Sequence, residues 1–187
     1  YHTAPADSLS FLENGSVDSV VIVLAIQNIE NLSGTFSECA RILKKGGRLF
    51  MVINHPAFRI PKRSSWQWEE SNSFATDENP DSSSKLKAGE DSNSKKQYRR
   101  VDAYMSERCE KIDMTPGESS EAKKKFTVTF HRPLQVFFKA LKKSGFAVTR
   151  LEEWISHKKS EKGPRAEEED RMRKEIPMFL CFEAIVK

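Results

Sequence analysis

Residues 17–55 read VDSVVIVLAIQNIENLSGTFSECARILKKGGRLFMVINH, and this stretch decides the fold. Residues 17–26 are almost continuously apolar, which is typical of a strand in a parallel sheet covered on both faces. Residues 30–43 carry apolar side chains at helical spacing, and residues 48–55 form a second apolar run. We therefore predict a strand, a crossover helix and a parallel strand, connected in the usual right-handed sense.

The end of the predicted helix carries turn signals. Lys44 and Lys45 would lie in its last turn, where cations complement the helix dipole. Gly46 and Gly47 follow, and glycine readily adopts the left-handed conformation that ends many helices. We therefore predict that the helix stops at these glycines and that the second strand begins at Arg48.

The middle of the chain differs in composition from both ends. Residues 62–96 are rich in Ser, Asp, Glu, Asn and Lys and nearly lack aliphatic residues, which predicts a flexible loop. Residues 97–131 alternate polar and apolar side chains around a Pro-Gly turn, which predicts an antiparallel hairpin that acts as a lid. Together they would form an insertion, 62–131, between two parts of a core, residues 1–61 and residues 132–187.

Regular structure resumes after the insertion. Pro133 is suited to open a helix, which the glycine at position 145 would end. A strand over 146–154, a short helix from Arg165 and a strand over 177–186 follow. Because no long amphipathic helix separates the last two strands, we expect them to pair antiparallel. The predicted fold class is α/β, a Rossmann-like mixed sheet with an inserted hairpin lid and a disordered loop.

Composition excludes several classes of protein. The chain has 187 residues, 37% hydrophobic and 31% charged, with a net charge of +4. No run approaches the roughly 20 apolar residues of a transmembrane helix, so we expect no membrane partner. The three cysteines lie far apart and form no CxxC pair, which predicts a cytoplasmic protein without a metal site. Its charges are mixed in sign, which makes a nucleic-acid partner unlikely by comparison with a chain that carries one basic stripe.

The segment Cys39-Ala-Arg-Ile-Leu-Lys-Lys-Gly-Gly-Arg-Leu49 and the strand before it resemble class I S-adenosylmethionine-dependent methyltransferases of the type 11 kind. In that family the fourth strand is followed by a helix that ends in an R-x-L-K-x-G-G-x-L signature and leads into the fifth strand. Gly145-Phe146 after a helix, and the closing apolar strand, also resemble the end of that fold. The resemblance implies S-adenosylmethionine as cofactor and methyl transfer to an O, N or C atom of a small-molecule acceptor.

The resemblance also implies which residues meet the cofactor. Tyr1–Leu12 resembles the segment that carries an Asp-Ala pair beside the adenine, with Pro5 in place of the Asp. The first predicted strand ends at the sheet edge where open α/β folds bind ligands. The residues expected at the cofactor are Ala6, Asp7, Leu24, Ala25 and Gln27.

The family's donor-binding loop has no counterpart in this sequence. A glycine-rich turn lets the backbone approach the cofactor, and an acidic residue pairs with its ribose hydroxyls. Neither feature precedes Asp18. By resemblance, we expect the chain to be the C-terminal portion of a methyltransferase and to be inactive alone.

Two residues after the second predicted strand are candidates for the acceptor site. His55 would act as a general base or orient an acceptor, and Arg59 would hold an acidic group. The alternative is a turn in which both side chains are structural. Further on, Trp66 and Trp68 would face the same side of an extended segment. They would form an apolar wall over the acceptor or, alternatively, anchor the insertion to the core.

His131 and Arg132 join the predicted hairpin to the next helix. Related small-molecule methyltransferases often carry a His-Arg pair here, near the acceptor pocket. The resemblance therefore makes His131 the preferred catalytic residue, ahead of His55, and Arg132 a substrate contact. A structural role at the helix entry is the alternative.

Two other functions stay open on the sequence. A chain that lacks the donor loop would serve as a non-catalytic interaction module. The Lys and Arg clusters within residues 95–125 would instead suit an RNA or protein methyltransferase. The acceptor, the methylated atom and the oligomeric state are not determined by the sequence.

Overall fold

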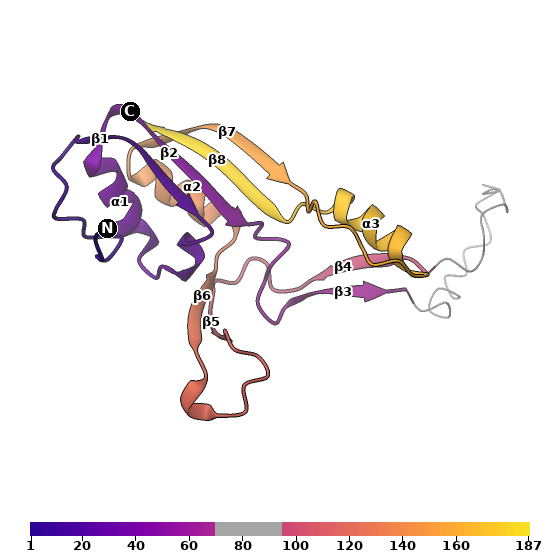
Figure 1. Cartoon of the computed structure of the whole chain (residues 1–187). Coiled ribbons are helices and arrows are strands. Elements are labelled where there is room, and N and C mark those ends of the chain that lie inside the picture. Colours follow the sequence, from indigo (N-terminus) through magenta and orange to yellow (C-terminus); the bar gives the residue numbers. More distant parts are fainter. Residues whose placement is uncertain (70–94) are drawn as a thin grey trace, which may run out of the picture.

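The computed structural model describes residues 1–69 and 95–187 (Figure 1). Its elements alternate between strands and helices at both ends of the chain, with short strands between them. In chain order they are β1 (Val17–Val23), the 3-10 helix η1 (Ile26–Asn28), α1 (Leu32–Ile42), β2 (Leu43–Asn54), β3 (Ser64–Trp68), β4 (Gln97–Val101), β5 (Arg108–Asp113), the 3-10 helix η2 (Glu121–Lys123), β6 (Phe126–His131), α2 (Leu134–Lys143), β7 (Phe146–Trp154), α3 (Ala166–Glu175) and β8 (Phe179–Val186).

The central sheet has four strands in the order β1-β2-β8-β7. β1 and β2 are parallel, whereas β8 runs antiparallel to both β2 and β7. The predicted strand–helix–strand unit and the antiparallel pairing of the last two strands are therefore confirmed. The fold is the expected Rossmann-like mixed α/β sheet.

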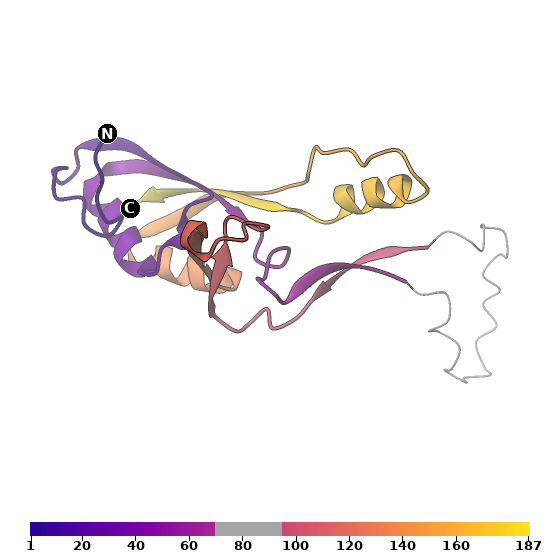
Figure 2. The same ribbon diagram turned by 60° about the horizontal axis from the view of Figure 1, so that its bottom comes forward.

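The hydrophobic core lies between the sheet and the helices α1 and α2, which cover the same face (Figures 1 and 2). Leu49, Met51 and Phe182 point to this face and are fully buried. On β1, by contrast, Val21 and Val23 are 65% and 56% exposed. The sequence predicted a first strand that is covered on both faces. This prediction is wrong for the described residues, because α1 and α2, the helices among them that pack on the sheet, lie on one face.

The glycine signature lies inside a strand rather than at a helix end. α1 ends at Ile42, and β2 already begins at Leu43, which pairs with Val17 before a register shift. Lys44 and Lys45 therefore belong to β2, and their predicted place in the last helical turn is wrong. Gly46 does have a left-handed backbone, with φ of 74°, so the glycine marks an irregularity in the strand pairing instead.

Two antiparallel hairpins occupy the middle of the chain. β5 pairs with β6, as predicted, but β4 pairs with β3. Ser64–Trp68 form β3 within the segment that we expected to be a flexible loop, and residues 70–94 of that segment lie outside the described residues. The division into core, insertion and core stays a prediction.

Arg99 attaches the β3–β4 hairpin to the core. Its guanidinium lies 4.2 Å from the ring centroid of Phe58 and 5.2 Å from that of Trp66, and it donates hydrogen bonds to the Phe58 carbonyl. Cation–π contact and hydrogen bonding thus hold the hairpin against the turn that follows β2. Figures 1 and 2 show this hairpin and α3 extending side by side away from the sheet.

No helix within residues 1–69 and 95–187 is long and apolar enough to cross a membrane.

Candidate functional site

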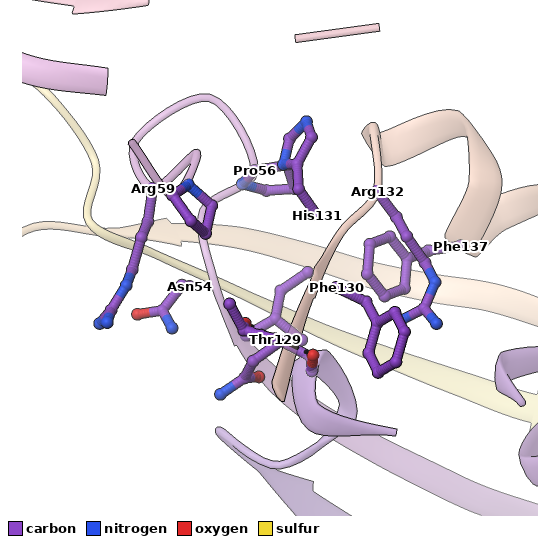
Figure 3. A pocket seen from close by; sticks show the side chains of 11 residues that line it. Asn54, Pro56, Arg59, Thr129, Phe130, His131, Arg132 and Phe137 are labelled. Atoms are coloured by element: carbon purple, nitrogen blue, oxygen red, sulfur yellow. Dashed lines mark hydrogen bonds between the residues drawn. The ribbon is translucent and has the colours of Figure 1, made fainter. Parts of the chain in front are cut away.

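A pocket lies where β1 and β2 end and the hairpin strand β6 passes over them (Figure 3). One wall comes from η1, one from the turn after β2 and one from β6. The lining residues are Gln27, Ile53, Asn54, Pro56, Arg59, Pro61, Thr129, Phe130, His131, Arg132 and Phe137. Its volume is about 30 Å³, enough for about two water molecules.

The turn after β1 forms one wall of this pocket. Leu24 takes a left-handed backbone with φ of 50°, and its N–H donates to the Val52 carbonyl, so the chain turns sharply into η1. Gln27 donates from Nε2 to the Leu24 carbonyl. The other amide atom, Oε1 of Gln27, is buried without a hydrogen-bond partner among the described residues. The pocket wall therefore presents an unpaired acceptor, which a ligand N–H or O–H would satisfy.

Ala6 and Asp7 lie in a turn near the start of α1. Asp7 accepts a hydrogen bond of 2.7 Å from Nδ2 of Asn31, whose Oδ1 in turn accepts from the Gly34 N–H as the helix N-cap. The Asp7 carboxylate is thus tied to the helix entry. Neither Ala6 nor Asp7 lines the pocket.

His55 has both ring nitrogens engaged. Nδ1 accepts a hydrogen bond of 3.2 Å from the Ala57 N–H, and Nε2 lies 2.9 Å from Oε1 of Glu153. Because an acceptor at Nδ1 places the ring proton on Nε2, the imidazole donates to the Glu153 carboxylate. The pair connects the turn after β2 to β7 and leaves no free lone pair on the ring.

His131 has one ring nitrogen engaged. It is 4% exposed, and its Nε2 lies 2.8 Å from the Tyr104 carbonyl, which can only accept, so Nε2 carries a proton. Nδ1 makes no hydrogen bond within the described ranges. In its neutral form this ring therefore offers a free lone pair, and the residue lines the pocket.

Arg132 points away from its neighbour His131 (Figure 3). Its Nη2 donates to the carbonyls of Ile29 and Glu30, at 2.9 and 2.7 Å, and its guanidinium lies over the Phe130 ring. Burial lowers the pKa of Arg132, but a guanidinium stays charged in proteins. These contacts join the end of β6 to the segment before α1, which favours the helix-entry role over the substrate contact expected from sequence.

Arg59 is exposed at the opposite side of the pocket, on the turn after β2 (Figure 3). Its guanidinium makes no hydrogen bond or ion pair with any described residue. Trp66 does not line the pocket; its ring lies 5.9 Å from that of Phe58, edge to face. The contacts of Trp66 thus support its alternative role, as an anchor of the hairpin.

The β5–β6 hairpin is docked at the edge where β1 ends. Nδ2 of Asn28 donates to the Thr127 hydroxyl at 2.9 Å, and the Thr129 hydroxyl lies 3.5 Å from the Gln27 carbonyl. Both contacts join η1 to β6. The hairpin expected to act as a lid therefore covers the candidate site, with residues of β6 facing the pocket.

Sequence reasoning missed the role of Tyr104. Its carbonyl accepts from His131, and its hydroxyl accepts from the Leu134 N–H at the start of α2, where Pro133 provides no side-chain cap. The tyrosine therefore fixes both the imidazole and the helix entry. Tyr104 precedes His131 by 27 residues in the sequence, so no local sequence pattern links the two.

A second missed feature is the arginine of the glycine signature. Arg41 binds Glu38 through two nitrogens, at 2.7 and 2.9 Å, and donates to the carbonyls of Leu9 and Leu12. The hydrogen bonds from Arg41 hold the pKa of Glu38 down, at about 2. The pair fixes the segment that leads from Asp7 to β1.

A larger cavity lies away from this site, between the β3–β4 hairpin and α3. Its volume is about 900 Å³, and Trp68 and Lys95 face α3 across it. The α3 residues that line it carry charges of both signs. They include Glu168, whose pKa is lowered to about 2 chiefly by its hydrogen bond with Arg171. Of the residues predicted from sequence for the site, Trp68 lies here and not at the smaller pocket.

The structure thus brings some of the predicted residues together and leaves others apart. Those that line the pocket are Gln27, Arg59, His131 and Arg132. Those that do not line it are Ala6, Asp7, Leu24, Ala25, His55 and Trp66. Asn54 and Thr129 line it without having been predicted; the position of Asn54 at the end of an apolar run was the available signal.

Residues 1–51 match a family model described as a methyltransferase domain. None of the curated proteins matches this chain. A solved S-adenosylmethionine-dependent methyltransferase from Mesorhizobium loti is similar to the chain, with 21% identity and a TM-score of 0.61, covering 99% of this chain and 68% of that one. A putative S-adenosylmethionine-dependent methyltransferase from Listeria monocytogenes is similar as well, with 20% identity, a TM-score of 0.59 and coverage of 97% and 66%.

The chain spans about two thirds of the length of each of these two structures. Their similarity extends over the sheet, the hairpins and the closing strands, because nearly all of this chain is covered. Residues 1–51 are therefore similar to a methyltransferase domain, and the chain shares its fold with these two solved structures.

Proposed function

We propose that this chain contributes the acceptor side of an S-adenosylmethionine-dependent methyltransferase that acts on an O, N or C atom of a small molecule. The observation that carries the proposal is that His131, whose Nδ1 has no partner among the described residues, lines a pocket at the carboxyl ends of β1 and β2. In open α/β sheets this edge is where ligands bind. The family match and the fold support the same reaction.

The turn after β1 fits one side of a cofactor site. Leu24 is 41% exposed beside the partly exposed Val23, so an apolar surface is available at the strand end. The unpaired Oε1 of Gln27 would accept a hydrogen bond from an amino group, and S-adenosylmethionine carries two amino groups. Leu24, Ala25 and Gln27 would therefore hold the cofactor here, while Ala6 and Asp7 would act from the neighbouring turn.

The cofactor, when bound, would supply a methyl group from its sulfonium. The sulfur would keep the electrons of the broken S–C bond and leave as a neutral thioether. The chain's own part is to align the acceptor, exclude water and remove a proton where the acceptor atom carries one. His131 is placed for the last task, since Tyr104 holds its Nε2–H and leaves Nδ1 free. An acceptor O–H or N–H proton would pass to Nδ1 as the new bond to carbon forms.

His55 is assigned a supporting role. Its ring would have to break a hydrogen bond to the Ala57 N–H before Nδ1 could accept a proton. The bond to Glu153 instead fixes the turn that carries Arg59 and one wall of the pocket. His55 is therefore a positioning residue in this proposal, and His131 is the catalytic base.

The hairpin is proposed as a lid over the acceptor. β6 supplies one wall of the pocket, and the pocket is smaller than any methyl acceptor. Entry of an acceptor therefore requires β6 to separate from η1, at the contacts of Asn28 and Gln27 with Thr127 and Thr129. Closure would then exclude water from the reacting atoms.

Calorimetry with S-adenosylhomocysteine tests the proposal. We expect weak binding by the 187-residue chain and tight binding by a version extended upstream with a strand and a glycine-rich loop. A Gln27→Leu variant should weaken binding in both, because it removes the free Oε1. Its matched control is Gln135→Leu, on α2 outside this pocket. Failure of the extended chain to bind would leave the non-catalytic interaction module as the better function.

An RNA methyltransferase is a second candidate, motivated by the lysines of the β5–β6 hairpin. Lys111 lies over the Phe126 ring at 4.0 Å, and both side chains are solvent-exposed. Gel-shift titration with a structured RNA over a salt series separates the two functions. Strong RNA binding that falls steeply with salt concentration would favour RNA as the methyl acceptor. The absence of a gel shift would favour a small-molecule acceptor.

A further inference from the structure

Arg59 is a free cation on the rim of the pocket. Its side chain is solvent-exposed, and no acidic side chain of the described ranges pairs with it. Other arginines around the site differ. Arg132 is occupied by the Ile29 and Glu30 carbonyls, and Arg99 by the Phe58 carbonyl and its ring.

The pocket lining carries positive charge without a counter-charge. Its eleven residues include two arginines and one histidine, and no Asp or Glu. Arg132 donates to carbonyls from Nη2, while its Nη1 is buried without a hydrogen-bond partner among the described residues. His131 in its neutral form adds no charge. Arg59 is therefore the cation of this lining that is exposed to solvent and has no partner in the described ranges.

We propose that the methyl acceptor is a monocarboxylic acid, whose carboxylate pairs with Arg59 while its nucleophilic atom lies at Nδ1 of His131. This inference rests on the proposed function and names its substrate class. A guanidinium matches a carboxylate through two parallel hydrogen bonds. A carboxylate balances the single charge of Arg59, whereas a phosphate dianion would leave one negative charge uncompensated at the rim.

The two groups come from opposite walls of the pocket. Arg59 belongs to the turn after β2, and His131 ends β6 (Figure 3). A molecule with a carboxylate and a nucleophile at its two ends would therefore bridge the walls and hold the lid against the core. Because Arg59 is exposed, the carboxylate can bind before the hairpin opens, and the acceptor would then be oriented as it enters.

The test uses matched pairs of probes that differ only in charge. The acids are 4-hydroxybenzoate, 2-aminobenzoate and lactate, each compared with its primary amide, and phenyl phosphate is the dianionic arm. Dissociation constants for the 187-residue chain are measured by protein-observed NMR, with and without S-adenosylhomocysteine. We expect at least one acid to bind about tenfold or more tightly than its amide. We also expect phenyl phosphate to bind more weakly than that acid.

Variants at position 59 complete the test. Arg59→Gln should abolish the preference for the acid over its amide, and Arg59→Lys should retain part of it. The control is Arg63→Gln, four residues along, which pairs with Asp102 and does not line the pocket. Acid and amide binding equally, no acid binding at all, a preference that survives Arg59→Gln, or tighter binding of phenyl phosphate would each overturn the proposal.

Binding of the donor keeps the two proposals distinguishable. Arg59→Gln should bind S-adenosylhomocysteine as the unmodified chain does, because Arg59 is not among the proposed donor contacts. If the acid preference is found but no chain binds S-adenosylhomocysteine, the methyltransferase proposal fails while the carboxylate site stands. If donor binding is found but the acid preference is not, only the substrate class is wrong.

Discussion

The two walls of the pocket hold their charged side chains in opposite ways. At the end of β6, His131 and Arg132 are 4% and 6% exposed, and each is fixed by backbone carbonyls. On the turn after β2, Arg59 is exposed and unpaired, and His55 is held by its neighbours through both ring nitrogens. Each wall thus carries one histidine and one arginine. Their burial and their hydrogen-bond partners differ, and so do their roles.

Residue type at a sheet edge therefore does not by itself define a role. A carbonyl partner orients a histidine and leaves its second nitrogen free, whereas an N–H partner removes that nitrogen from use. The buried Arg132 uses its Nη2 to join segments of the fold, whereas the exposed Arg59 leaves all its donors open to a ligand.

The largest expected effect separates the two histidines. His131→Ala in a chain that carries the donor loop should lower kcat by about 100-fold or more, because it removes the general base. His55→Ala should lower it by less than about tenfold, since only positioning is lost. The readout is S-adenosylhomocysteine formation on an acceptor that needs deprotonation. A larger loss from His55→Ala would reverse the assignment of roles.

The two arginines should differ in stability. Arg132→Met should lower the free energy of unfolding by about 2 kcal/mol, because two partly buried carbonyls lose a charged donor. Arg59→Met should change it by less than about 0.5 kcal/mol, as for other exposed positions. Urea denaturation of both variants measures the difference. Equal effects would mean that Arg132 does not anchor the helix entry.

Arg99 should stabilise one wall locally. Arg99→Met removes its contacts with the Phe58 and Trp66 rings and its hydrogen bonds, a loss of about 1–2 kcal/mol. Hydrogen exchange should quicken in β3 and β4 and stay unchanged in β2 and β8. Faster exchange throughout the central sheet would show that the hairpin is not a separate attachment.

The smallest effect is a pH dependence outside the pocket. The lowered pKa of Glu38, about 2, means that its ion pair with Arg41 stabilises the fold above the usual pKa near 4.5. That stability is lost as the pH falls from about 4.5 to about 2. Glu38→Gln should therefore show a smaller fall in urea midpoint over this range than the unmodified chain. Glu161→Gln, at an exposed position, should fall as the unmodified chain does.

The fold was predictable to a large extent, because long apolar runs and helical spacing are local signals. The parallel β1–β2 unit, α2 and the antiparallel β7–β8 pair follow from such patterns. β3 was missed because Ser64–Trp68 has few aliphatic residues and is stabilised by Arg99, 31 residues beyond it. The end of α1 was misplaced because strand pairing with Val17 outweighed the helix-stop signal.

The site was predictable only in part, for a physical reason. Sequence placed Gln27, Arg59 and His131 near the ends of strands, and the topology brings such ends together. It could not show that Nδ1 of His55 accepts from Ala57, or that the partner of His131 is the carbonyl of Tyr104. Both hydrogen bonds join a histidine ring to a backbone N–H or carbonyl. The position of such a backbone group depends on the fold and cannot be predicted from the type of side chain.

The central claim is that ligands bind at the carboxyl ends of β1 and β2, and not at the larger cavity beside α3. Backbone amide shifts of the 187-residue chain, followed during titration with S-adenosylhomocysteine, test it most directly, since NMR detects weak binding. We predict the largest shifts at Leu24, Gln27 and His131. Shifts that concentrate at Trp68 and along α3, and leave the β1 exit unchanged, would contradict it.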